Sequence, residues 1–389
     1  MKKTGEFVKK LYNKDGSFSF SPLNKVSNLY STCFGIMCLD LINQLNYINK
    51  EKTINLILKF QDKKTGYFLD KNCIQKTGHK HDKDYLTWQL TDFAQMALST
   101  LNAKPKHKYN FLKKYKNKNY LTKWFYSLNW KDPWLVSNQI MFLLNFFIYE
   151  NKFKNKKYIN HLIFLLNKNQ DKKNGFWNLG KKTSFHNQMA GAYHFLFFYT
   201  YLDKKPRHIK KIIGSTLFIQ DYDGLFNYAG GGGACDDLDA IDLLCRSTFY
   251  TSYKKEKIEE ALQKAYFNLL KNKNEDGGFC WAKRDFLSLK KIINSIKPSL
   301  ISLNYKDFLS NFKSKLINQI KILLKLKISW KYSGLDSMKL SCNTSDIWST
   351  WARLLSIALI EETFPRICKN KKSFKWNMRN KCGLGFYKK

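Results

Sequence analysis

The residues best suited to chemistry are four aspartates within seven positions, directly after a run of four glycines. The aspartates are Asp236, Asp237, Asp239 and Asp242, and the glycines occupy 230–233. Carboxyl groups crowded in a cavity raise one another's pKa, so that one can stay protonated and act as a general acid. They could instead hold a divalent cation such as Mg²⁺ that bridges a diphosphate. We therefore select Asp236, Asp237 and Asp239 as candidate catalytic residues.

The glycine run and the helix expected after it allow two interpretations. Gly232 and Gly233 carry no side chain, so backbone amides there could approach an anion or a sugar closely. Against this, Asp236 and Asp239 have the spacing of an N-cap and the third helical position, where acidic side chains favour a helix start. Capping explains one or two acids, but not four in a chain with net charge +38. A functional site is the stronger hypothesis.

A recurring turn sequence indicates which elements position these aspartates. It reads Gln-Asp followed by Gly and an aromatic residue in its fuller copies. The copies have their glycine at Gly16, Gly66, Gly175, Gly224 and Gly277, spaced by about fifty residues or twice that. Such a period is typical of stacked supersecondary units. Glycine permits the positive φ of a tight turn, so we assign the turn itself a structural role.

Helical patterns fill the segments between the turns. An amphipathic stretch precedes each turn and a strongly apolar stretch follows it; the apolar stretches cover 32–42, 91–101, 138–149, 190–201, 239–249 and 350–360. A helix that is apolar all round is buried. The sequence therefore predicts an all-α fold, an α/α toroid of about six helical hairpins closing around a central cavity. We expect a single domain over 1–365 with a basic insertion at about 286–329, and a basic C-terminal tail, 366–389, packing on the outside.

The repeated turn between paired helices resembles the repeat of the terpenoid-cyclase and protein-prenyltransferase superfamily, which includes squalene cyclases. The resemblance covers nearly the whole chain, from about Asp15 to Ile360. It implies a cavity for an isoprenoid or isoprenoid-linked substrate. Class II cyclases of this superfamily carry Asp-x-Asp-Asp, whose middle aspartate protonates an alkene or epoxide. This chain matches that motif as Asp237-x-Asp239 and has Ala240 in place of the last aspartate.

The resemblance also bears on metals. Protein prenyltransferases hold zinc through an Asp, a Cys and a His at the starts of inner helices. In this chain Cys235 and Asp237 stand in the opposite order, and the last inner helix begins at Asp346 without a histidine nearby. Zn²⁺ is therefore disfavoured, whereas Mg²⁺ stays compatible with the carboxylates.

The starts of the other inner helices should converge on the mouth of the same cavity. In that register the candidate substrate-binding residues, besides Gly232 and Gly233, are Trp88, Gln89, Asn138, His186, Asn187, Asp346 and Trp348. Amide, imidazole and aromatic groups of this kind suit a sugar or an isoprenoid head. His186 can equally be a structural histidine. Arg246, one turn beyond Asp242, is expected to pair with that carboxylate.

Three classes of function fit these features. The first is a terpenoid-cyclase or prenyltransferase-like enzyme that uses Asp237 or Asp239 as general acid or metal ligand. The second is a carbohydrate-active toroid, a hydrolase, lyase or epimerase of surface-polysaccharide metabolism, with two of these carboxylates as an acid/base pair. The third is a non-catalytic binding scaffold. A closed aromatic cavity favours the first class, an open polar groove the second, and a cavity filled by side chains the third.

Charge and cysteine usage narrow the partners and the compartment. The net charge of +38 comes mostly from lysines spread along the chain, and no nucleic-acid-binding motif occurs, so we expect no specific nucleic-acid partner. The nine cysteines are odd in number and include no Cys-x-x-Cys, which predicts a cytoplasmic protein without a disulfide framework. The stretch 313–324 in the insertion is basic and amphipathic; it is either a solvated surface helix or a peripheral membrane contact.

Overall fold

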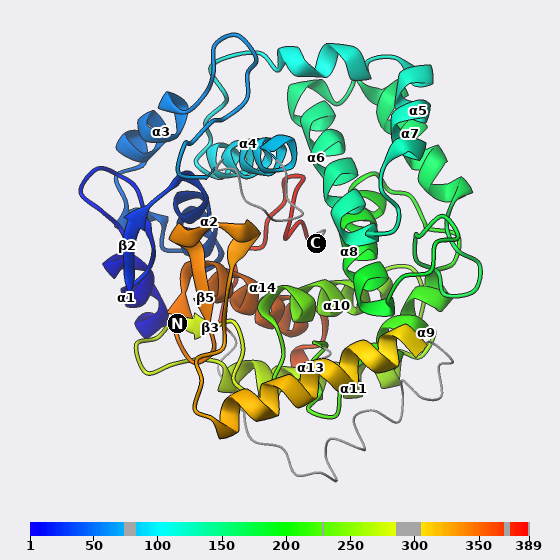
Figure 1. Cartoon of the computed structure of the whole chain (residues 1–389). Helices are drawn as coiled ribbons and strands as arrows, with labels where there is room; N and C mark the ends of the chain where they lie inside the picture. The colour runs from blue at the N-terminus through cyan, green and yellow to red at the C-terminus, as the bar shows by residue number, and fades with distance from the viewer. Residues whose placement is uncertain (74–82, 228, 285–304, 369–373, 388–389) are drawn as a thin grey trace.

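Six apolar helices form a closed inner ring. The computed structural model describes residues 1–389 except 74–82, 228, 285–304, 369–373 and 388–389. The inner helices are α2 (Leu29–Leu41), α4 (Lys83–Thr100), α6 (Pro133–Asn151), α8 (Phe185–Tyr201), α10 (Ala234–Ser247) and α14 (Ile347–Thr363). Each packs on the next, and α14 packs on α2, which closes the ring (Figure 1).

Six amphipathic helices surround this ring, one before each inner helix. They are α1 (Lys2–Lys10), α3 (Lys50–Lys59), α5 (Lys118–Ser127), α7 (Lys156–Lys168), α9 (Ile209–Ile219) and α11 (Lys255–Lys271). They bury only one face; α3, for example, buries Thr53 and Ile57 and exposes its lysines. The predicted all-α toroid of helical hairpins is therefore confirmed.

The recurring turns hold the hairpins together. The side-chain amide of Gln170 donates to the carbonyl oxygen of Gly175 at 2.8 Å, and Gln220 does the same to Gly224 at 2.8 Å. The glycines have positive φ, and a Cβ on Gly66 would overlap the carbonyl oxygen of Lys108. The repeat is thus explained by backbone geometry, as predicted.

Strands in the described residues are short and form antiparallel pairs. They are β1 (Ser19–Ser21) with β2 (Asn24–Ser27), β3 (Phe279–Cys280) with β6 (Ser345–Asp346), and β4 (Ser329–Lys331) with β5 (Lys339–Ser341). Short 3-10 helices complete the fold: η1 (Leu45–Tyr47), η2 (Asn110–Tyr115), η3 (Tyr332–Gly334), η4 (Asp336–Met338) and η5 (Pro365–Cys368). The β4–β5 hairpin matters most for the site, because it brings Trp330 and Tyr332 to the cavity.

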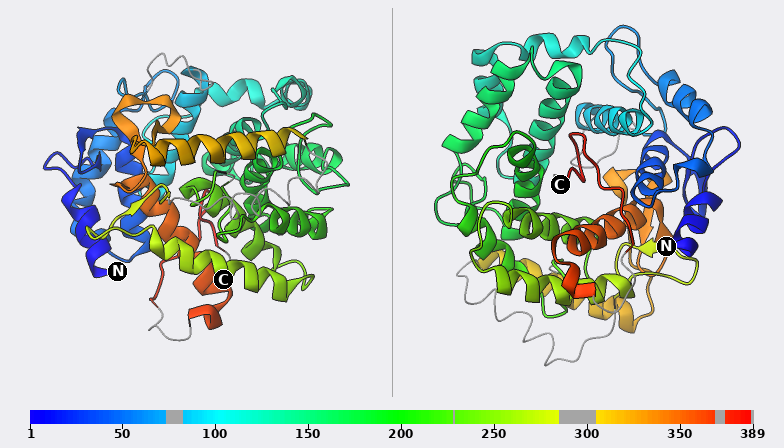
Figure 2. Two further views of the ribbon diagram at one scale, coloured as in Figure 1. Left: turned by 60° about the horizontal axis from the view of Figure 1, so that its bottom comes forward. Right: turned by 180° about the vertical axis from the view of Figure 1, so that it is seen from behind.

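The predicted insertion supplies a separate helix. Its described part contains α13 (Tyr305–Leu323), which lies across the rim of the ring (Figures 1 and 2). The preceding residues 285–304 lie outside the described ones. Ser314, Ile317 and Asn318 of α13 line the cavity, so the insertion covers part of its mouth.

The predicted position of the C-terminal tail is wrong. The described residues of the tail do not wrap the outside; seen along the axis of the ring, the red segment before the C-terminus lies within the ring (Figure 1; Figure 2, right). Trp376, Cys382, Leu384 and Phe386 are buried. The physical reason is burial of apolar surface: basic residues dominate the composition of the tail, but its apolar residues pack across one end of the ring.

Candidate functional site

The centre of the ring holds two adjoining chambers. One cavity, of about 540 Å³, lies beside α13, and we call it the outer chamber. The other, of about 440 Å³, lies beneath the β4–β5 hairpin, and we call it the inner chamber. Their linings share five residues: Trp134, Cys235, Asp239, Trp281 and Trp330. The two chambers therefore meet at the start of α10.

Seven aromatic side chains line the inner chamber. They are Phe93, Trp134, Tyr193, Trp281, Trp330, Tyr332 and Trp348. Their rings also pack on one another; the Trp281 and Trp330 centroids lie 4.9 Å apart, and those of Tyr332 and Trp348 5.1 Å apart. Aromatic faces carry partial negative charge, so this lining can hold hydrocarbon and stabilise a positive charge.

Asp239 is the carboxyl group that both chambers share. It is only 3% exposed, and among the described residues it makes no hydrogen bond and no ion pair. Burial first, and then the neighbouring carboxyl groups of Asp236, Asp242 and Asp237, raise its pKa well above the usual range of an aspartate. The protonated form of Asp239 is therefore favoured more than in an exposed aspartate, and the residue lines both chambers.

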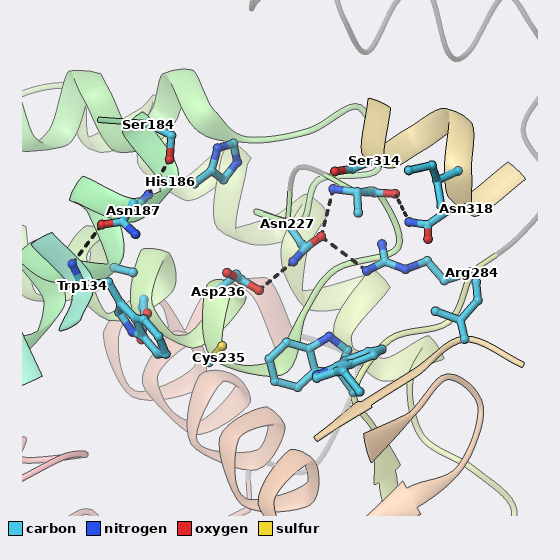
Figure 3. A pocket seen from close by; sticks show the side chains of 17 residues that line it. Trp134, Ser184, His186, Asn187, Asn227, Cys235, Asp236, Arg284, Ser314 and Asn318 are labelled. Atoms are coloured by element: carbon cyan, nitrogen blue, oxygen red, sulfur yellow. Dashed lines mark hydrogen bonds between the residues drawn. The ribbon is translucent and has the colours of Figure 1, made fainter. Parts of the chain in front are cut away.

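Asp236 faces the outer chamber and is held differently. Its carboxylate accepts a hydrogen bond from the amide of Asn227 at 2.7 Å, and Asn227 in turn accepts one from Arg284 at 3.3 Å (Figure 3). Burial raises the pKa of Asp236 to about 6, although the Asn227 amide opposes this. Asp236 is thus the more acidic neighbour of Asp239.

Asp237 and Asp242 have structural partners. The buried Asp237 carboxylate accepts hydrogen bonds from the backbone N–H groups of Phe226 (2.7 Å) and Gly233 (3.0 Å), and it forms an ion pair with the buried Arg353 of α14. Asp242 binds Arg246 through two hydrogen bonds of 2.6 and 2.5 Å, as expected from their spacing. Neither carboxyl group lines either chamber.

The glycines support the carboxylates and do not line the chambers. A Cβ on Gly232, whose φ is +74°, would lie 2.5 Å from an oxygen of Asp237, and one on Gly233 would overlap the Asp236 carboxyl group. Gly232 and Gly233 therefore have a packing role, and that they contact substrate stays a prediction. Only glycine lets the loop lie this close to two carboxyl groups.

The other predicted residues divide into two groups. His186 and Asn187 line the outer chamber, and Gln89, Asn138 and Trp348 line the inner one. Burial lowers the pKa of His186 to about 3, with Lys315 contributing, so its imidazole is neutral. Whether these five residues bind substrate stays a prediction.

Trp88 and Asp346 are not at the chambers. Trp88 donates to the Tyr67 hydroxyl at 3.1 Å and packs on Trp124 away from the cavity. Asp346 caps α14, accepting from the backbone and hydroxyl of Ser349 at 2.7 Å each, and burial raises its pKa to about 7. Each is one or two helix positions from a lining residue, which the predicted register could not resolve.

Two polar atoms of the inner chamber stand out: one belongs to Tyr193, which was not predicted, and the other to Trp348, which was. The hydroxyl of Tyr193 and the indole nitrogen of Trp348 are buried without a hydrogen-bond partner among the described residues. Burying an unpaired polar group is costly, so both can serve a bound molecule or water. Tyr193 lies one turn after Ala190, a lining residue, and a helical projection of α8 would have found it.

The described residues contain no group of three His, Cys, Asp or Glu side chains that could hold a metal ion. We therefore assign no ligand set there, and Mg²⁺ stays a prediction.

The ring and its cavity define the class of protein, an α/α toroid. The family model of the prenyltransferase alpha-alpha toroid domain matches residues 1–85. Among solved structures, a form of the type II terpene cyclase MstE from Scytonema in complex with geranylgeranyl dihydroxybenzoate is similar with a TM-score of 0.52. The identity is 10%, and the match covers 93% of this chain and 97% of that one.

A second MstE structure, in complex with the product merosterolic acid A, has a TM-score of 0.51 and 10% identity, covering 93% of this chain and 96% of that one. No sequence among the curated proteins matches the chain. The chain thus shares the α/α-toroid fold of these solved structures, and residues 1–85 match the prenyltransferase toroid model.

Proposed function

We propose that the protein is a terpenoid-cyclase-like enzyme that binds an isoprenoid chain in the inner chamber and starts ring closure by protonating an alkene from Asp239. The observation that carries the proposal is the state of Asp239: a buried carboxylic acid with a raised pKa and no described hydrogen bond, next to aromatic walls. Similar structures of the type II terpene cyclase MstE hold geranylgeranyl dihydroxybenzoate as substrate and merosterolic acid A as product.

The proposed reaction is a proton-neutral isomerisation. The Asp239 proton adds to one alkene carbon, and a second alkene attacks the resulting carbocation to form a carbon–carbon bond. Loss of a proton from the final cation balances the equation. The aromatic lining stabilises the cation through the negative faces of its rings, and Asp236 and Asp242 keep the Asp239 proton in place by disfavouring a second negative charge.

The test is incubation of the whole chain with geranylgeranyl dihydroxybenzoate and with geranylgeranyl diphosphate in deuterium oxide. We expect an isomer of the substrate that carries one solvent deuterium on carbon, detected by mass spectrometry and NMR. An isomer without deuterium would contradict alkene protonation. Recovery of unchanged compound from both substrates, with protein of proven fold, would count against the proposed activity.

The alternatives have weaker support. A sugar-active site would need a second carboxyl group facing the same ligand as Asp239, but Asp237 is ion-paired with Arg353 and lines neither chamber, and Asp236 lines the outer chamber alone. A non-catalytic scaffold was expected to fill its centre with side chains, whereas two chambers lie there.

We also propose that α13 binds an anionic membrane surface beside the mouth of the cavity. The burial along α13 is inverted: Lys315 and Gln319 are buried, while Leu309, Phe312, Leu316, Ile320 and Leu323 are exposed. Their spacing puts these five on one face. Lys313 and Lys325 are exposed beside them, which complements negative lipid headgroups.

None of the described helices is both long and apolar enough to cross a bilayer. The nine free cysteines support the predicted cytoplasmic location.

Charge reversal on this face should release the protein from membranes. We expect Leu316→Glu and Ile320→Glu each to weaken binding to vesicles of phosphatidylserine and phosphatidylcholine by about tenfold or more, because a carboxylate resists burial in lipid. Co-sedimentation measures the effect. Phe153→Glu is the matched control, since Phe153 is also highly exposed but lies outside α13. Equal binding of all three variants and the parent would remove α13 as the membrane contact.

A further inference from the structure

The C-terminal tail closes the end of the ring opposite the mouth, through contacts with all six inner helices. Hydrogen bonds join tail residues to five of these helices. The pairs, with the tail residue first, are Asn377 with Leu41 of α2, Arg379 with Thr100 of α4, Cys382 with Tyr149 of α6, Phe386 with Arg246 of α10, and Trp376 with Glu361 of α14. The ring of Phe386 also packs on Tyr201 of α8. Every one of these partners lies near the C-terminal end of its helix. The tail is therefore a plug across the base of the toroid.

A Gly-Leu-Gly sequence forms the part of the plug that reaches the inner chamber. Leu384 lines the chamber, and it is flanked by Gly383 and Gly385, both with positive φ. A Cβ on Gly383 would lie 2.9 Å from the Met96 sulfur, and one on Gly385 would lie 3.1 Å from Leu355. The two glycines thus let the backbone pass between α4 and α14, so that Leu384 alone presents a side chain at this point.

The distance from this plug to the acid is set by α10. Arg246 follows Asp239 by seven residues, which is roughly 10 Å along the helix axis at the usual rise. Arg246 donates to the carbonyl oxygen of Phe386 at 2.8 Å, two residues after Leu384. The space between the proton donor and the plug is therefore short and fixed at both ends by the same helix.

We propose that Leu384 is the floor of the inner chamber and determines the length of hydrocarbon chain that the protein accepts. The inference rests on the proposed function for the identity of the ligand. Its physical basis is exclusion: a chain that extends past the floor must displace a buried leucine held between two close-packed glycines, which costs packing energy.

The experiment measures length preference in binding. Geraniol, farnesol and geranylgeraniol are titrated against the whole chain, with tryptophan fluorescence as the signal because three tryptophans line the inner chamber beside Trp134. The variants are Leu384→Ala, which deepens the chamber, and Leu384→Phe, which makes it shallower. Met378→Ala is the control, since Met378 is a buried residue of the same tail that does not line the inner chamber. Circular dichroism confirms the fold of each.

We expect the two Leu384 variants to shift the preference in opposite directions. Relative to the parent, Leu384→Ala should favour the next longer alcohol by about tenfold, and Leu384→Phe should disfavour it by a similar factor, as for pocket changes of a few methylene groups. Met378→Ala should leave the ratio unchanged. A general loss of stability would weaken all three alcohols together, so only the reciprocal shift supports the floor, and one folded variant suffices to test it.

Other outcomes separate this inference from the proposed function. An unchanged length preference in both Leu384 variants, or a parent that binds none of the alcohols, would overturn the floor. A preference that follows Leu384 without any deuterium-labelled isomer would leave the floor standing and contradict the cyclase. A deuterium-labelled product with a length preference that does not depend on residue 384 would support the cyclase and contradict the floor.

Discussion

The variant Asp239→Asn is expected to form the deuterium-labelled isomer about a hundred to ten thousand times more slowly than the parent. An amide cannot donate a proton to an alkene carbon, and general acids contribute effects of this size. The matched control is Asp84→Asn, an exposed aspartate in the first turn of α4, which should keep the parent rate. Parent-like turnover by Asp239→Asn would show that another group supplies the proton.

The same variant should not lose stability at neutral pH. The pKa of Asp239 is raised in the folded protein, so the acid contributes stability at low pH that is lost as the pH rises through the folded pKa. The asparagine has no such dependence. We therefore expect the melting temperatures of the variant and the parent to be equal near pH 4. As the pH increases toward 8, the melting temperature of the variant should rise relative to that of the parent. A variant that loses relative stability with rising pH would contradict a protonated Asp239.

The neighbouring variant Asp237→Asn should behave in the opposite way. It removes the counter-ion of Arg353, whose guanidinium is fully buried and also donates to the Trp281 carbonyl oxygen. Leaving one charge of a buried pair uncompensated costs about 3–5 kcal/mol. We expect a loss of that order in the free energy of unfolding, measured by urea titration.

A double variant provides the control for this ion pair. Asp237→Asn combined with Arg353→Met removes both charges and should recover much of the lost stability, so that the coupling energy of the cycle is large. If Asp237→Asn and Asp239→Asn were equally stable, the ion pair would not be the contact that ties α10 to α14.

These predictions depend on a distinction that the sequence motif does not make. Asp237 and Asp239 are two residues apart, and spacing alone allowed either to be the acid. In a helix, residues two apart point in clearly different directions. The structure assigns Asp237 to Arg353, which is more than a hundred residues later in the chain, and leaves Asp239 facing both chambers.

The sequence by itself determined the architecture of this protein and the place of its acidic segment. Turn glycines with positive φ and helices that are apolar all round depend on local sequence, and the same pattern of residues recurs in each repeat. Five of the seven candidates from the other inner helices line the chambers, because the start of each inner helix can be located from its repeat.

Only the tertiary structure decided which side chains are free to act and where the cavity ends. Trp88 turns away while Gln89 turns inward, which follows from a rotation of α4 that its sequence pattern does not specify. The tail was predicted outside because its lysines dominate its composition. It lies across the ends of the six inner helices, where Trp376, Leu384 and Phe386 are buried. Charge pairing and burial of this kind join residues distant in the chain, so no local pattern records them.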